Sequence, residues 1–192
     1  KVIMTNLKIL IKKVIDPGIP KISRSLREKL KRTKIVIADV GSTGFVPEIF
    51  FPIFNSCFFY TFDPDPRAVS SKYENINNIP YGLSSEKKRE KIYLTHFQPA
   101  SSLYRPNEDF LKNYLNAESS NVVSEDYIEL ETLDSILRSD KKIDFIKIDT
   151  EGADLDILKG GDKTLNECLG IKIEVQFKER NLGSPMFGEL DK

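Results

Sequence analysis

Three aspartates stand where apolar runs end, so their carboxylates could be brought together by the fold. The first run, from Ile35, has the continuous apolar character of a strand buried on both faces of a sheet, the runs over 57–62 and 143–149 are also typical of buried strands, and the three end at Asp39, Asp63 and Asp149. Because the carboxyl ends of parallel strands meet at one edge of a sheet, the three side chains should face one crevice. A buried carboxylate is unfavourable unless a partner compensates its charge. The pattern therefore predicts a ligand-binding crevice lined by acids.

The segment after Asp39 forms a glycine turn, with Gly41 and Gly44 in the pattern Asp-x-Gly-x-x-Gly. Glycine lets the backbone turn sharply and come close to a ligand. Asp63 lies 22 residues beyond Gly41, where nucleotide-binding sheets place the carboxylate that accepts two ribose hydroxyls. An anion at position 39 would repel a pyrophosphate but attract an ammonium or sulfonium group. The turn therefore favours S-adenosylmethionine as the ligand, and the lack of a Gly-Lys-Ser/Thr motif excludes a P-loop.

The elements that must position these residues alternate between strands and helices, which predicts an α/β fold with a parallel sheet and right-handed crossovers. The predicted strands span 35–39, 57–62, 76–83, 91–95, 127–130, 143–149 and 171–177. The predicted helices span 47–54, 66–75, 133–137 and 153–159. Pro52 should shorten or kink the first of these helices, and Asp65 should cap the second. No element is predicted after residue 177.

A polar excursion over 97–124 interrupts this alternation, and one helix is predicted near 107–117. Long segments of this kind inside a compact domain are more often functional than not. Tyr104 and Arg105 within it suit a glycan or a phosphate better than an apolar molecule. The excursion is therefore predicted to form the substrate-side wall of the site.

Charge divides the chain into a basic extension and an acidic body. The formal net charge of the 192 residues is zero, yet residues 1–34 carry eleven Lys or Arg and only two acids. The pattern predicts an N-terminal extension over 1–33, with helices at 2–15 and 22–32, before an α/β domain over 34–192. The extension should dock on its own acidic domain or on a partner, and the alternative is peripheral contact with an anionic membrane surface. No nucleic-acid partner is expected.

The remaining composition, 40% hydrophobic and 30% charged, is typical of a soluble globular domain. No apolar run approaches the roughly 20 residues that span a bilayer, and there is no secretory signal pattern. Cys57 and Cys168 lie in apolar surroundings outside any Cys/His spacing, as expected for reduced thiols of a cytoplasmic protein. One histidine and two distant cysteines argue against a zinc site, and no metal is predicted.

Four segments of the sequence resemble the FkbM-type methyltransferases, a family of the class I methyltransferase superfamily. They are Asp39-Val-Gly-Ser-Thr-Gly44, Phe62-Asp-Pro-Asp-Pro66, Tyr81-Gly-Leu-Ser84 and Phe145-Ile-Lys-Ile-Asp-Thr-Glu-Gly-Ala-Asp-Leu-Asp-Ile-Leu-Lys-Gly-Gly161. The fourth segment is the most specific, because all class I methyltransferases share the glycine turn. The resemblance covers roughly 35–177. The chain departs from the family at Asp63, where members often have the longer Glu.

The resemblance implies a three-layer α/β/α Rossmann-like sheet of seven strands, of which this chain, as a fragment, would lack the last two. It implies S-adenosylmethionine as methyl donor and O-methylation of a hydroxyl on a sugar, a glycan or a secondary metabolite. By position, the donor-binding residues would be Asp39, Gly41, Ser42, Gly44, Asp63, Pro64, Leu83 and Ser84. Asp39 and the two glycines would hold the methionine half, Asp63 the ribose, and Leu83 with Ser84 the adenine.

A base is needed to take the proton of the acceptor hydroxyl. The resemblance places Asp149 next to the transferring methyl group and Glu151 on the acceptor side, so both are candidates. His96 is a third candidate, because it ends a predicted edge strand just before the excursion. Two alternatives stay open for the whole chain: an NAD-type dehydrogenase or epimerase of the same topology, and a non-catalytic methyltransferase-like module in a glycan-assembly protein.

Overall fold

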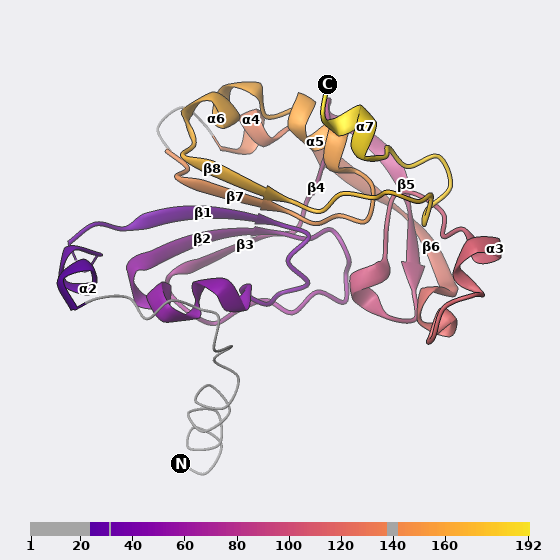
Figure 1. The fold of residues 1–192 in the computed structure, drawn as a ribbon, viewed down its shortest axis with the longest axis horizontal. Coiled ribbons are helices and arrows are strands. Elements are labelled where there is room, and N and C mark those ends of the chain that lie inside the picture. The colour runs from indigo at the N-terminus through magenta and orange to yellow at the C-terminus, as the bar shows by residue number, and fades with distance from the viewer. Residues whose placement is uncertain (1–23, 31, 138–141) are drawn as a thin grey trace, which may run out of the picture.

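A sheet of five parallel strands forms the centre of the molecule (Figure 1). The computed structural model describes residues 24–30, 32–137 and 142–192. The strand order is β3 (Ile76–Ile79), β2 (Cys57–Phe62), β1 (Ile35–Val40), β7 (Phe145–Ile148) and β8 (Gly170–Ile173). The chain builds outward from β1 to β3 and then returns to the other side of β1. The strand order therefore reverses between β1 and β7, and ligands of open α/β sheets bind at such a reversal.

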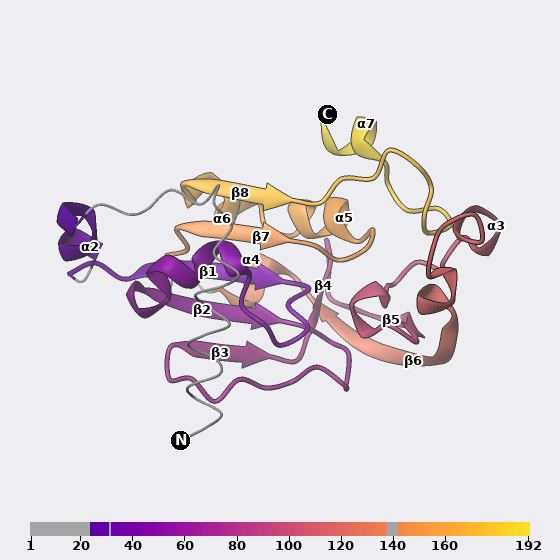
Figure 2. The same cartoon turned by 60° about the horizontal axis from the view of Figure 1, so that its bottom comes forward.

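Helical segments cover both faces of this sheet, as the predicted three-layer α/β/α fold requires (Figure 2). On one face, Ala38 and Val40 pack with Leu133 of α4 (Leu133–Ile136) and Ile157 of α5 (Asp154–Lys159). On the other face, Phe50 of η1 (Glu48–Ser56) packs its ring edge-on against rings of β2 and β7, with centroids 5.8 and 5.7 Å away. Alternate residues of β1 thus serve two hydrophobic cores. A further helix, α6 (Asp162–Glu167), follows α5.

A second, smaller sheet stands beyond the carboxyl ends of the central strands (Figure 1). Its middle strand, β6 (Val122–Glu131), pairs antiparallel with β5 (Lys88–Thr95) and parallel with the short β4 (Gly82–Leu83). The single strand predicted over 76–83 is therefore wrong, because the chain leaves the central sheet after Ile79 and joins the second one. Pro80 lies at this exchange, and proline has no N–H for a central ladder.

One of the helix predictions is wrong and another is confirmed. The helix predicted over 47–54 forms over Glu48–Ser56, as a 3-10 helix with Pro52 inside it. The helix predicted over 66–75 does not form, since no helix lies between Asp63 and β3. Asp65 does not cap a helix, because its carboxylate accepts hydrogen bonds from the backbone and side chain of Arg67.

The excursion and the chain end are more structured than predicted. The excursion contains η2 (Gln98–Ala100), α3 (Glu108–Leu111) and η3 (Ala117–Ser120). The last strand, β8, ends at Ile173 and not at residue 177, and α7 (Phe187–Leu190) follows where no element was predicted. The segment between β8 and α7 runs back to the excursion, where Pro106 and Asn181 form an antiparallel bridge.

The N-terminal extension is described only in part. An α-helix, α2 (Arg24–Leu30), lies within the second predicted helical stretch. The amphipathic helix predicted over 2–15 lies outside the described residues. Over the described ranges, none of the helices is both long enough and apolar enough to cross a membrane.

Candidate functional site

The carboxyl ends of β1, β2 and β7 open into one cleft at the reversal of strand order, with about 590 Å³ of empty space that includes open solvent. The central sheet contributes Gly41, Thr43, Asp63, Pro64 and Asp149, and the second sheet and the excursion contribute Leu83, Ile92, Gln98, Ser101, Ser102 and Leu130. The predicted crevice at the sheet edge therefore exists, and the second sheet forms its opposite wall.

The glycine turn is set by backbone contacts. Gly41 has φ +74°, and a Cβ there would lie 1.9 Å from the carbonyl oxygen of Asp149. Gly44 has φ +88°, and a Cβ there would lie 2.1 Å from the carbonyl oxygen of Val69. Both positions therefore require glycine. Between them, Thr43 adopts φ +50°, which is costly for a β-branched side chain. Strain of this kind is held where the surrounding structure over-determines the backbone.

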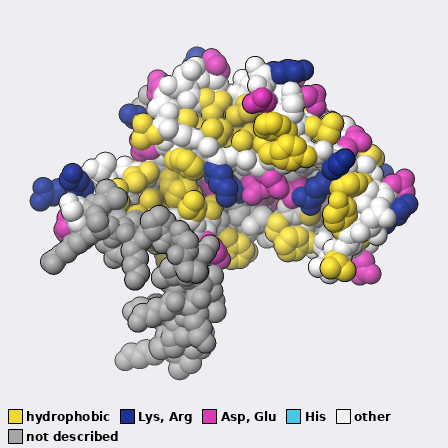
Figure 3. All heavy atoms as spheres, viewed as in Figure 1, with side chains coloured by type: hydrophobic (Ala, Val, Ile, Leu, Met, Phe, Trp, Pro, Cys, Tyr) yellow, Lys and Arg dark blue, Asp and Glu magenta, His cyan; other side chains and the backbone are white. Residues whose placement is uncertain are grey.

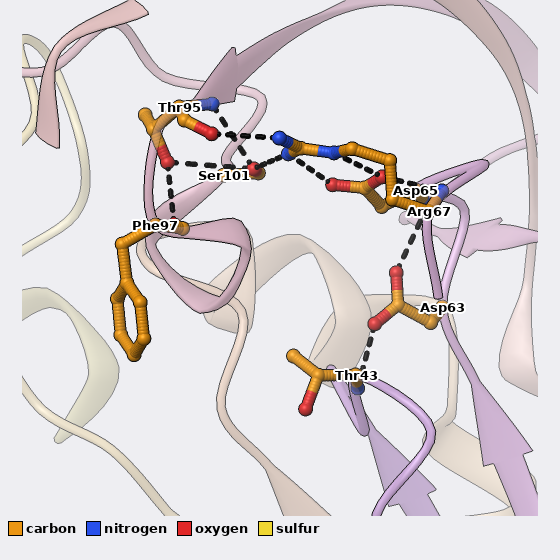
Figure 4. Close-up of polar contacts among 7 residues, drawn as sticks. All are labelled: Thr43, Asp63, Asp65, Arg67, Thr95, Phe97 and Ser101. Carbon is orange, nitrogen blue, oxygen red and sulfur yellow. Dashed lines mark hydrogen bonds and ion pairs between the residues drawn. The ribbon is translucent and has the colours of Figure 1, made fainter. Parts of the chain in front are cut away.

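Asp63 is the residue that holds the strained turn (Figure 4). Its Oδ2 accepts the N–H of Thr43 at 2.7 Å, and its Oδ1 accepts the N–H of Asp65 at 2.9 Å. Burial raises the pKa of Asp63, while the two backbone donors lower it. Each carboxylate oxygen keeps a second lone pair, so Asp63 can still accept two hydroxyl protons from a ligand in the cleft.

An arginine joins this loop to the second sheet (Figure 4). Arg67 forms a bidentate pair with the buried Asp65, with Nη2 2.6 Å from Oδ2 and Nε 3.0 Å from Oδ1. The same guanidinium donates to the carbonyl of Thr95 at 2.8 Å and to Ser101 Oγ at 2.9 Å. Sequence reasoning missed this contact, because its partners, Thr95 of β5 and Ser101 directly after η2, lie about 30 residues away. The Arg67 pair fixes the distance between the two walls of the cleft.

A buried lysine compensates the acids at the centre of the edge. Lys147 is the register partner of Asp39 on the neighbouring strand, and its Nζ lies 3.3 Å from Asp39 Oδ1 and 3.4 Å from Asp149 Oδ2. The ammonium also donates to the carbonyl of Gly41 at 3.1 Å. Lys147 was not predicted. The sequence did contain a signal for it, because a lysine inside a largely apolar strand is unfavourable to bury unless an acid lies beside it.

Asp39 lies behind the cleft and not on its surface, so the prediction that all three acids face the crevice is wrong for Asp39. It is fully buried, and neither carboxylate oxygen accepts a hydrogen bond from the described residues. Burial raises the pKa of Asp39 to about 6, although the attraction of Lys147 lowers it. The contact with Lys147 is therefore an ion pair that leaves Asp39 with unused acceptor capacity.

Two glutamates extend the acidic edge toward the excursion. Glu151 adopts φ +56° and lies 3.6 Å from Arg180, and burial raises its pKa. Its carbonyl accepts Ser102 Oγ at 2.8 Å. Glu174, which follows β8, contacts the Asp149 carboxylate, and burial together with that carboxylate raises the pKa of Glu174 to about 8. Acidic side chains gather over the carboxyl ends of the central strands in Figure 3. Glu174 was also missed, because the last strand was predicted to continue through it.

The remaining predicted residues divide between cleft and surroundings. Leu83 lines the cleft, whereas Ser84 is buried behind it and its N–H donates to the carbonyl of Glu131 at 2.9 Å. Ser42 is also buried, and its Oγ accepts the N–H of Gly44 at 3.4 Å. His96 is exposed and lines neither the cleft nor any other described cavity. The structure therefore does not bring His96 together with Asp149.

The cleft fits the methionine donor better than a metal. Among the described residues, no three Asp, Glu, His or Cys side chains are grouped so as to hold a metal ion. The free lone pairs of Asp63 suit ribose hydroxyls, and the negative charge of Asp39 behind the turn suits a cationic group in the cleft. Gln98 Nε2, buried in the opposite wall, has no hydrogen-bond partner among the described residues and could donate to a ring nitrogen. S-adenosylmethionine therefore fits the residues present.

Comparison with known proteins also indicates a methyltransferase. The family model of the methyltransferase FkbM domain matches residues 38–192. The chain belongs to the FkbM methyltransferase family. Searches of curated proteins and of solved structures found no match. In this FkbM domain the matched range contains every residue named above as lining the cleft, together with Asp39, Lys147 and Glu174 behind and beside it.

Proposed function

We propose that this FkbM domain is an S-adenosylmethionine-dependent O-methyltransferase. The observation that supports this most is Asp63, which holds the glycine turn and still presents acceptor lone pairs to a cleft at the strand reversal. The buried Asp39 behind the same turn adds negative charge where the donor is cationic.

The residues have separable roles in this proposal. Asp63 accepts the ribose hydroxyls, Leu83 packs beside the adenine, and the turn around Gly41 receives the methionine half. Asp149 lies beside the reacting methyl group. S-adenosylmethionine supplies that methyl group on a sulfonium sulfur, which keeps the electron pair of the broken bond. Most of the rate enhancement then comes from positioning the acceptor hydroxyl.

The acceptor hydroxyl must also lose its proton. Asp149 lines the cleft and Glu151 lies two residues beyond it beside Arg180, so the acidic group around Asp149 suits this role better than the exposed His96. The acceptor is a hydroxyl of a sugar, a glycan or a secondary metabolite. We also propose that the protein acts in the cytoplasm and contacts a membrane peripherally through its N-terminal extension.

Calorimetric titration distinguishes this function from the two alternatives. The chain should bind S-adenosylhomocysteine with one site and should not bind NAD. Asp63→Ala should weaken binding by at least about a hundredfold, because two hydrogen bonds to a charged group are lost, each worth about 1.5–3 kcal/mol. Glu129→Ala, an exposed acid on β6, is the matched control and should leave affinity unchanged. Binding of NAD alone would support a dehydrogenase, and binding of neither would support a non-catalytic module.

The reaction itself is tested with a labelled methyl group. We expect transfer of the methyl group from S-adenosylmethionine to members of a panel of nucleotide sugars and glycan intermediates. The product should be a methyl ether, which is stable to base. Transfer only to carboxyl or amine groups would refute the O-methylation.

A further inference from the structure

A second cavity, of about 980 Å³ and open to solvent, lies between the excursion and the chain that follows β8. One wall is formed by residues 110–120 and the other by residues 174–180. The two walls are joined at one end, where the Asn107 N–H donates to the Arg180 carbonyl and the Leu182 N–H donates to the Arg105 carbonyl, each at 2.8 Å. The views in Figures 1 and 2 agree that α3 and the segment after β8 lie side by side.

The cavity combines aromatic rings with planar polar groups. Phe110 and Tyr114 of the excursion form a tilted pair with centroids 5.0 Å apart, and Phe177 stands on the other wall. Glu174 and Arg180 also line the cavity. Ring faces pack against the C–H faces of a cyclic sugar, while carboxylate and guanidinium groups bind its hydroxyls. The lining therefore suits a polyhydroxylated molecule better than a purely apolar one.

A buried glutamine in this cavity lacks a partner. Gln176 is only 7% exposed, and its Oε1 accepts Ser184 Oγ at 3.1 Å. Its Nε2 has no hydrogen-bond partner among the described residues. One end of the amide is therefore held by Ser184, and the other end is left for a ligand. A hydroxyl satisfies that end because it can both donate and accept.

The second cavity meets the donor cleft at a pair of carboxyl groups. Asp149 lines the cleft, Glu174 lines the second cavity, and the two side chains are in contact. Their backbones are also joined, since the Glu174 N–H donates to the Ile148 carbonyl at 3.0 Å. This pair of carboxyl groups therefore stands between the donor cleft and the second cavity.

The groups around Glu174 raise the affinity of its carboxylate for a proton. Burial, contact with Asp149 and repulsion by Glu151 raise its pKa to about 8, while Arg180 lowers it. A carboxylate is most effective as a general base when its pKa lies near the working pH.

On the proposed function, we infer that the second cavity binds the methyl acceptor, a polyhydroxylated sugar-like molecule, and that Glu174 takes the proton of the reacting hydroxyl. The hydroxyl oxygen gains the methyl carbon and its O–H bonding pair stays on oxygen. The proton passes to a carboxylate oxygen of Glu174, and the sulfur keeps the pair of the broken C–S bond. Gln176 holds a second hydroxyl and orients the ring.

Binding of the acceptor can be measured without turnover. Saturation-transfer NMR with methyl glycosides of common hexoses and 6-deoxyhexoses should give signals with the full chain. Ala117→Trp, which fills the cavity, should abolish them, whereas Glu118→Trp, on the same turn but outside the cavity, should not. Retention of the signals in Ala117→Trp, or no binding of any glycoside to the wild-type chain, would overturn the assignment.

The role of Glu174 is tested with Glu174→Gln, which keeps the shape of the side chain. With a glycoside that binds, methyl transfer should fall by about 10²–10⁴-fold, while glycoside and S-adenosylhomocysteine binding persist. Carbon-13 NMR of the wild-type chain should show the Glu174 carboxyl titrating near pH 8. The rise of the methyl-transfer rate around that pH should be absent from Glu174→Gln. Glu179→Gln, on the exposed part of the same segment, is the control.

The two levels of proposal fail separately. A chain that does not bind S-adenosylhomocysteine refutes the methyltransferase function itself. A chain that binds it and methylates a glycoside at the wild-type rate after Glu174→Gln refutes only the role of Glu174. Equal transfer by Ala117→Trp and wild type refutes the acceptor cavity.

Discussion

Asp39→Asn should stabilise the ligand-free chain and weaken donor binding. In the folded chain burial raises the pKa of Asp39 from 3.8 to about 6, even with Lys147 beside it. The folded chain therefore binds this proton more tightly than the unfolded chain. At neutral pH the ionised carboxylate opposes folding, and its amide analogue has nearly the same shape without the charge.

The magnitude follows from the pKa difference. One pKa unit corresponds to about 1.4 kcal/mol, so ionised Asp39 lowers the free energy of unfolding by about 3 kcal/mol at pH 7. The effect is absent below pH 3.8, grows as the pH rises toward 6, and is complete above that. Asp39→Asn should thus unfold like wild type near pH 4 and gain up to about 3 kcal/mol at pH 7.

Urea unfolding of both chains at pH 4, 5, 6 and 7 measures this difference, because the other titrating groups are common to both. Asp109→Asn, at an exposed acid on α3 whose pKa is lowered by Lys112, is the control and should gain no stability relative to wild type as the pH rises from 4 to 7. Calorimetry at pH 7 should show weaker S-adenosylhomocysteine binding to Asp39→Asn. A variant that is less stable than wild type at pH 7, or a difference that does not change with pH, would refute the reasoning.

Three further substitutions test the framework of the site. Gly41→Ala should lower the free energy of unfolding by about 2–4 kcal/mol, because its Cβ would meet a carbonyl oxygen at 1.9 Å; thermal unfolding should show little change for Gly188→Ala, whose Cβ meets nothing within 4 Å. Arg67→Ala should lower the free energy of unfolding by about 2 kcal/mol, because it leaves the buried carboxylate of Asp65 unpaired. Urea unfolding measures this loss with the exposed Arg89→Ala as control, and equal stability of the two variants would refute it. Lys147→Met should lower the free energy of unfolding by about 3–5 kcal/mol, because it leaves Asp39 and Asp149 without their shared cation. A variant as stable as wild type would show that these two acids are already neutral.

The sequence predicted the central strands and the acids at their ends, because these depend on local patterns. Predominantly apolar runs marked β1, β2 and β7, and a carboxylate at the end of each run marked the edge. Strand ends alone were enough to bring Asp63 and Asp149 to one cleft.

The partners of these acids could not be predicted, because they depend on contacts across the fold. Lys147 pairs with Asp39 only through the register of two strands far apart in the chain. Asp65 has the sequence context of a helix cap, but its carboxylate pairs with Arg67, which also bonds to Thr95 of the second sheet, and no helix forms. Glu174 acquires its neighbours only because the chain leaves the sheet after Ile173.

A crystal structure of the chain with S-adenosylhomocysteine and a bound glycoside tests the central claim most directly. The account predicts the ribose hydroxyls on the carboxylate of Asp63, the sulfur beside Asp149, and a glycoside hydroxyl within hydrogen-bond distance of Glu174. A nucleoside bound away from Asp63, or a glycoside whose hydroxyls approach the sulfur from a side that excludes Glu174, would contradict it.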